Sequence, residues 1–186
     1  QIPDLPIIVD SPMASDATEV YAQHHREYDD SSLGIVSKGR MPFAVRNLYY
    51  TQSVQESIKL NSVNEPMIVI AGSGMLTGGR ILHHLKHRVS SPRNTVLFVG
   101  FQSPGSRGAW LKGGAKSFKL FGQETMVQAD IREISGLSAH ADQAELLRWC
   151  RACSEKPGRV SIVHAEPDSA QAFKLKLEQE FGWEVA

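Results

Sequence analysis

Two histidines lie where catalytic or metal-binding groups are often found. His164 follows the apolar run 160–163, so it would stand at the carboxyl edge of a strand, where open α/β sheets bind ligands. His140 lies among small residues in 136–142, just before a predicted helix whose N-terminal N–H groups attract anions. Such a histidine could contact a phosphate. Ordinary polar residues at a strand end and a helix start would give the same pattern.

A glycine-rich loop at 72–79 is a second candidate for phosphate binding. It follows an apolar strand and opens a helix, the setting of nucleotide-binding loops. Thr77 stands where G-x-G-x-x-G needs its third glycine, and no Gly-Lys-Ser/Thr follows, so both common nucleotide templates fail. The turn, with Ser73 and Gly74, could still offer backbone N–H groups to a phosphate. Close packing of a helix on a strand explains the glycines equally well.

The helix after this loop contains the pattern H-H-x-x-H. Its first and last histidines, His83 and His87, share a helix face, as two zinc ligands would. The glutamate of H-E-x-x-H is absent, because His84 stands in its place. The pattern therefore favours ordinary helix-face histidines.

The two cysteines, Cys150 and Cys153, form a single C-x-x-C pair near the C-terminal end of a predicted helix. A redox pair normally lies at a helix N-terminus, where the helix dipole lowers the thiol pKa. A four-cysteine zinc site would need a second pair. We therefore expect packing cysteines in a reducing, cytoplasmic compartment.

The composition and charge of the chain limit the classes of partner. The chain has 186 residues, 41% of them hydrophobic, and its 20 Lys+Arg balance its 20 Asp+Glu, so no global positive field indicates nucleic acid or membrane as the partner. Basic residues do gather at 86–93 and 107–119, among glycines and aromatics, as in grooves for single-stranded nucleic acid. No run of 18 apolar residues occurs, so no transmembrane helix is expected. Without an initiator Met, the chain is expected to be a piece of a longer protein.

The predicted strands and helices that must position these residues indicate an α/β fold, with a mainly parallel sheet flanked by helices. Apolar runs predict strands at 6–10, 48–51, 66–71, 94–100 and 159–163. Helical spacing predicts helices at 14–28, 53–60, 80–89, 142–153 and 169–181. The order of strand, helix and strand at 66–100 predicts a βαβ unit. A strand pair is expected at 117–120 and 125–134, the second alternating as a half-solvated antiparallel strand does.

Five strings in a fixed order connect the chain to a known family. They are D-S-P-M-A at 10–14, G-S-G-M-L-T-G-G-R at 72–80, N-T-V-L-F-V-G-F-Q at 94–102, G-L-S-A-H-A-D-Q at 136–143 and V-H-A-E-P at 163–167. Together they resemble the β-CASP branch of the metallo-β-lactamase fold. This branch includes ribonuclease J, archaeal and bacterial RNA-processing nucleases and the endonuclease subunit of the cleavage and polyadenylation factor.

The resemblance implies roles for three residues. His140 is similar to the family's motif B histidine, which contacts the scissile phosphate and helps to protonate the leaving oxygen. Ser138 would bind a phosphate oxygen. His164 resembles the motif C histidine, a ligand of one of two active-site zinc ions. Ala165 departs from the glycine that usually follows that histidine.

The resemblance also implies a domain organisation. Residues 1–124 would be the β-CASP domain, and residues 125–186 the C-terminal portion of the metallo-β-lactamase nuclease domain. Most zinc ligands, including the H-x-H-x-D-H loop, would precede the chain. We therefore expect this piece neither to hold zinc stoichiometrically nor to cleave RNA alone.

The full-length protein is then expected to be a zinc-dependent ribonuclease with two Zn²⁺, an endo- or exonuclease of RNA processing or decay. Its partners would be the phosphate backbone of single-stranded RNA and the rest of the metallo-β-lactamase domain, with no membrane; a homodimer stays open. Two alternatives remain: a nucleotide- or cofactor-binding α/β module that uses the glycine loop, and a catalytically dead RNA-binding scaffold.

Overall fold

Two compact units make up the chain. The computed structural model describes residues 4–40, 42–43, 45–137 and 140–186. The first unit is Gln1–Leu137 and the second is Ser138–Ala186. Among the described residues, no helix is long and apolar enough to span a membrane.

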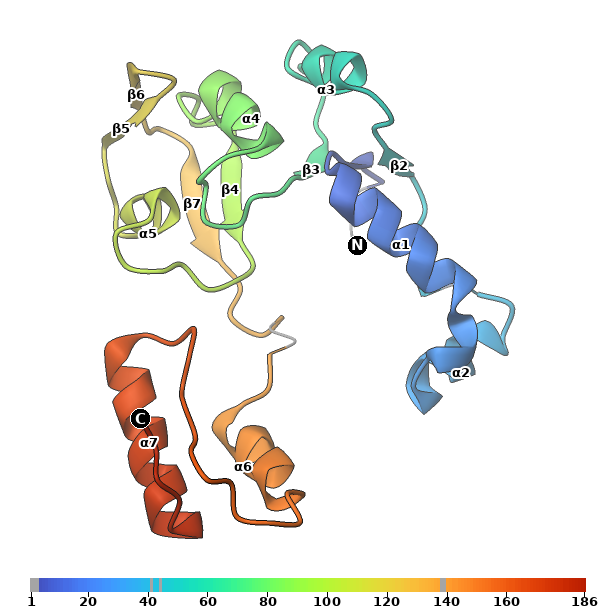
Figure 1. The fold of residues 1–186 in the computed structure, drawn as a ribbon. Helices are drawn as coiled ribbons and strands as arrows, with labels where there is room; N and C mark the ends of the chain where they lie inside the picture. Colours follow the sequence, from blue (N-terminus) through green and yellow to red (C-terminus); the bar gives the residue numbers. More distant parts are fainter. Residues whose placement is uncertain (1–3, 41, 44, 138–139) are drawn as a thin grey trace. The chain divides into compact units, whose positions relative to one another are not determined.

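A three-stranded parallel sheet organises the N-terminal part of the first unit (Figure 1). Its strands are β1 (Ile7–Val9), β2 (Leu48–Tyr50) and β3 (Ile68–Ile70), with β1 in the centre. All three lie within predicted apolar runs, and the parallel pairing confirms the predicted fold class. Because the strands are parallel, the segments that follow them leave the sheet at one common edge.

Each strand of this sheet leads into a helix. These helices are α1 (Pro12–Gln23), α3 (Val54–Leu60) and α4 (Arg80–Arg88). Ser11 caps α1 and Ser53 caps α3, each accepting a hydrogen bond from a first-turn N–H. The single helix predicted at 14–28 is wrong, because α1 ends at Gln23 and the short 3₁₀ turn His25–Glu27 follows it. The helix α2 (Asp30–Val36) comes next.

A second parallel pair joins β4 (Thr95–Phe98) to β7 (Asp130–Glu133), and β5 (Ser117–Leu120) forms an antiparallel hairpin with β6 (Gln123–Met126). The helix α5 (Arg107–Lys112) lies between β4 and β5 in sequence.

Two predictions about these strands are wrong. The antiparallel strand predicted at 125–134 is interrupted, because the N–H groups of Gln128 and Ala129 both donate to the carbonyl of Val89. Its second half becomes β7, which runs parallel to β4. The predicted βαβ unit also fails in its pairing, since β3 pairs with β1 and β4 with β7.

The core of the first unit lies between α4, α5 and the two-stranded elements. It is formed by buried side chains from these elements and the segments beside them: Leu76, Leu82, Leu85, Val89, Phe98, Leu111, Phe118, Leu120 and Ala129. Glycine at position 108 favours the close approach of α5, because a Cβ there would force the carboxamide of Gln102 to move and would lie 3.3 Å from Phe98.

The second unit is built on α6 (Gln143–Arg151) and α7 (Pro167–Phe181), which pack around Leu147, Cys150, Leu177 and Val185. Asp142 and Glu145 form a capping box that starts α6. The strand predicted at 159–163 is wrong, because this segment makes only an isolated parallel bridge between Val160 and Val185.

Candidate functional site

A fully buried carboxylate stands at the carboxyl edge of the three-stranded sheet. Asp10 directly follows β1, and its Oδ1 accepts hydrogen bonds from Arg80 Nη1 (2.6 Å) and Thr51 Oγ1 (2.6 Å). Its Oδ2 accepts from Ser57 Oγ (2.6 Å) and lies 2.6 Å from His84 Nε2. Four donors therefore surround one carboxylate.

These contacts keep Asp10 ionised. Burial alone would raise its pKa, but the hydrogen bonds from Ser57, Thr51, His84 and Arg80 together lower the pKa from 3.8 to about 2. An ionised carboxylate can only accept hydrogen bonds, so His84 Nε2 carries the proton that it shares with Asp10. Because Arg80 neutralises the carboxylate, the cluster avoids the cost of an unpaired buried charge.

The hydrogen bonds of this cluster join the segments that follow the three strands of the sheet. Asp10 follows β1, Thr51 follows β2, and Ser57 lies in α3. Arg80 and His84 lie in the first two turns of α4. The sequence pattern H-H-x-x-H predicted ordinary histidines on a helix face. This prediction is wrong for His84, which is buried in the cluster, whereas His83 is exposed.

This arrangement predicts a specific acid sensitivity. Because the pKa of folded Asp10, about 2, lies below its ordinary value of 3.8, its stabilisation is complete above about pH 5 and is lost as the pH falls from about 4 to 2. The loss should amount to about 2 kcal/mol in the free energy of unfolding. Urea unfolding followed by circular dichroism from pH 7 to pH 2 measures it. Asp10→Asn is the control, since it should flatten this part of the profile; an unchanged slope in that variant would contradict the assignment.

The glycine loop folds back on the same edge of the sheet. Gly79 caps α4 with a φ of +76°, and a Cβ there would lie 3.1 Å from the carbonyl oxygen of Gly72, so only glycine fits without strain. Ser73 Oγ lies 2.9 Å from Thr77 Oγ1. The carbonyl of Gly74 accepts a hydrogen bond from Gln102 Nε2 (3.1 Å). Close packing therefore explains Gly79, whereas a Cβ at Gly74 or Gly78 would meet no described atom within 4 Å. Phosphate binding by Ser73 and Gly74 stays a prediction.

The predicted histidines both belong to the second unit. His140 is exposed and precedes α6 by three residues, and His164 is exposed with a φ of +60° in the segment before α7. Ser138, the predicted phosphate contact, lies outside the described residues. The roles of all three stay predictions.

Zinc needs more ligands than the described residues supply. Within 4–40, 42–43, 45–137 and 140–186, no group of three or more His, Cys, Asp or Glu side chains could hold a metal ion. A zinc site in this fold takes at least three protein ligands. The described residues therefore do not form a zinc site by themselves.

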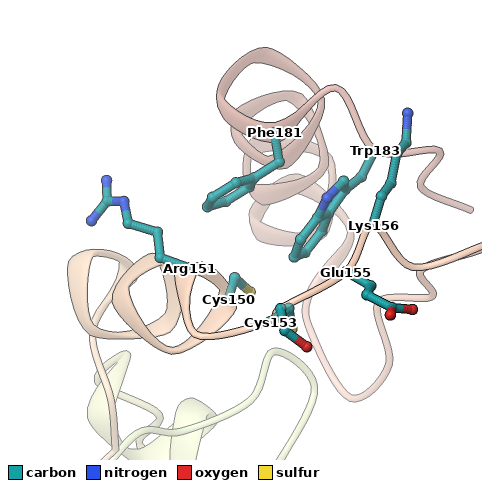
Figure 2. Close-up of a pocket in the computed structure, with 8 residues that line it drawn as sticks. Cys150, Arg151, Cys153, Glu155, Lys156, Phe181 and Trp183 are labelled. Atoms are coloured by element: carbon teal, nitrogen blue, oxygen red, sulfur yellow. The ribbon is translucent and has the colours of Figure 1, made fainter.

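The cysteine pair lies beside a small hollow of about 240 Å³ in the second unit (Figure 2). Phe181 and Trp183 stack there with ring centroids 4.6 Å apart. Cys150 is buried, as a packing cysteine should be, whereas Cys153 is exposed. Burial, followed by the nearby Cys153, raises the pKa of the Cys150 thiol. The buried thiol is thus a poor nucleophile at neutral pH.

Two family models match successive parts of the chain. Residues 1–111 match the family model of the Beta-Casp domain. The chain belongs to the β-CASP family. Residues 124–186 of this β-CASP chain match a second model, described as the Zn-dependent metallo-hydrolase RNA specificity domain. Zinc is thus implied for full-length members of the family.

Curated relatives support the same assignment. The chain is 38% identical to "Ribonuclease TTHA0252" of Thermus thermophilus, in an alignment that covers 93% of this chain and 39% of the relative. It is 31% identical to "Transcription termination factor FttA" of Pyrococcus abyssi, over 96% of this chain and 28% of the relative. The chain therefore spans well under half the length of these relatives.

Proposed function

We propose that this β-CASP chain is the RNA-holding part of a zinc-dependent ribonuclease. The observation that carries the proposal is the succession of two family matches, the Beta-Casp domain at 1–111 and a metallo-hydrolase RNA specificity domain at 124–186. The name of the Thermus relative, a ribonuclease, supports RNA as the substrate. The β-CASP domain is proposed to extend to about residue 124, as the family resemblance implies.

Within this proposal, each predicted site residue has a defined role. His140 contacts the scissile phosphate and donates a proton to the leaving oxygen. Ser138 binds a phosphate oxygen, and Ser73 and Gly74 bind the RNA backbone. His164 supplies one metal ligand, and the remaining ligands come from polypeptide outside this chain.

A direct test compares the 186-residue chain with the full-length protein. The full-length protein should contain close to two zinc ions and cleave single-stranded RNA, since two-metal hydrolysis requires a pair of ions about 3.5–4 Å apart. The 186-residue chain should bind RNA but neither hold zinc stoichiometrically nor cleave. Metal analysis and a gel assay of labelled RNA measure both.

Three results would overturn this function. Close to two zinc ions on the 186-residue chain would contradict the proposed distribution of ligands. Affinity for NAD without affinity for RNA would favour a nucleotide-binding module. A full-length protein that binds RNA, lacks zinc and does not cleave would be a scaffold.

A further inference from the structure

An apolar pocket opens on the first unit beside α3 and α4, next to the Asp10 cluster. It encloses about 480 Å³, within the roughly 300–1,000 Å³ typical of ligand pockets. Side chains of α3, the start of α4 and the β5–β6 turn line it: Val54, Ser57, Ile58, Asn61, Arg80, Leu82, His83 and Phe121, with Gly78 and Gly79. Among these described lining residues none is acidic, and Arg80 is cationic.

A stacking surface stands at its rim. The rings of Phe121 and His83 lie 4.8 Å apart, tilted by 32°. Lys86 Nζ lies 5.7 Å from the centre of the Phe121 ring. Phe121 is half exposed, so its ring does not serve the core. A nucleobase stacks favourably on such aromatic rings, and a neighbouring lysine suits the phosphate of the same nucleotide.

The backbone at Phe121 shows that a large side chain is unfavourable there. Phe121 and Gly122 form the two-residue turn between β5 and β6, with φ values of +50° and +79°. Turns with two positive φ values favour Asn-Gly or Asp-Gly. A phenylalanine in the first position is strained, and the hairpin does not need its ring. The ring therefore serves a purpose other than turn formation.

One polar atom on the pocket wall lacks a partner. Asn61 Oδ1 is buried, and among the described residues no donor reaches it. Buried acceptors are normally satisfied. This oxygen is closed to solvent, so a ligand in the pocket would reach it only after a shift of the Asn61 side chain.

We propose that this pocket binds one unstacked base of single-stranded RNA, stacked on Phe121 and His83, with Lys86 at the adjacent phosphate. The inference rests on the proposed function for its ligand. It adds a base-binding position to a chain whose other predicted contacts are to phosphates. Such stacking tolerates any base because every base has a π-face.

The variant Phe121→Asn tests the pocket without disturbing the fold, since it creates the favoured Asn-Gly turn. Two labelled probes are compared by fluorescence anisotropy at low salt: a short oligoadenylate, and an abasic ribose-phosphate oligomer of the same length. The 186-residue parent chain should prefer the oligoadenylate. Phe121→Asn should weaken that binding by about 5- to 100-fold, the range for one stacked base, and leave binding of the abasic oligomer unchanged.

Tyr21→Asn is the matched control, because Tyr21 is another exposed aromatic, in α1, and its ring packs on Phe43. It should change binding of neither oligomer. The melting temperature of Phe121→Asn should not fall below that of the parent, so a loss of binding cannot be unfolding.

Three outcomes would overturn the pocket. The parent could bind both oligomers equally, or Phe121→Asn could weaken both equally. Sedimentation could instead show a dimer that Phe121→Asn dissociates, which would make the pocket an interface between copies. RNA cleavage and zinc content of the full-length protein decide the proposed function separately. If the full-length protein cleaves RNA but the 186-residue chain does not prefer the oligoadenylate to the abasic oligomer, the pocket alone is refuted.

Discussion

Replacing Asp10 with alanine is expected to lower the free energy of unfolding of the 186-residue chain by about 3–5 kcal/mol, the cost of removing one partner from a buried ion pair. The change leaves Arg80 Nη1 without its 2.6 Å carboxylate partner and His84 Nε2 without its acceptor. Thr51 and Ser57 lose acceptors as well. Urea unfolding at pH 7 measures the loss.

Asp29→Ala is a matched control for this experiment. Asp29 caps α2 from an exposed position, with its carboxylate accepting from the N–H of Ser32 at 2.7 Å. Removing such an exposed cap should cost much less than removing a buried ion-pair partner. If Asp10→Ala and Asp29→Ala lower the free energy of unfolding equally, the Asp10 cluster contributes no more than a surface cap. Its role in joining the segments that follow the three strands would then be refuted.

The strands and helices around this cluster were predictable because their signals are local. Continuous apolar runs placed β1, β2 and β3, and the serine cap with helical spacing placed α3 within a residue of its observed bounds. The helix α4 begins at the predicted residue, Arg80, because the glycines before it cannot continue a helix pattern.

Strand partners were not predictable from the same signals. Alternation in 125–134 shows that one face is apolar, but it does not say which strand lies alongside. The choice of β4 as the parallel partner depends on hydrogen bonds between residues more than 30 apart, such as Asp130 N to Asn94 O. The strand prediction at 159–163 was wrong for a similar reason, because Val163 is 79% exposed and the segment makes a single isolated bridge within the described residues.

The buried cluster was missed because its members are far apart in sequence. His84 pairs with Asp10 across 74 positions, whereas the spacing of the neighbouring histidines is visible locally and favoured a surface face. One signal could have found it: Asp10 ends an apolar strand at the edge where parallel sheets place polar groups. His140 and His164 could be selected from sequence for their positions and for the family resemblance, and their roles stay predictions.

In the full-length protein, His140→Ala is expected to reduce turnover of RNA by about 10²–10⁴-fold, the usual contribution of a general acid or base. The physical reason is that the leaving ribose oxygen departs poorly without a proton. The defect should shrink on a p-nitrophenyl phosphodiester, because its leaving group is already acidic. Ser138→Ala should cost much less, about 1 kcal/mol, equivalent to one neutral hydrogen bond. Initial rates on both substrates measure these effects.

Zinc content separates His140 from His164 in the same experiment. A metal ligand must be deprotonated to bind, and its removal weakens metal affinity, so His164→Ala should lose zinc and activity together. His140→Ala should retain its zinc, because its proposed contacts are to the phosphate and the leaving oxygen. A His140→Ala protein without zinc beside a His164→Ala protein with full zinc would reverse the two roles. Equal rate losses on RNA and on the activated ester would refute proton donation by His140, since the ester needs no acid.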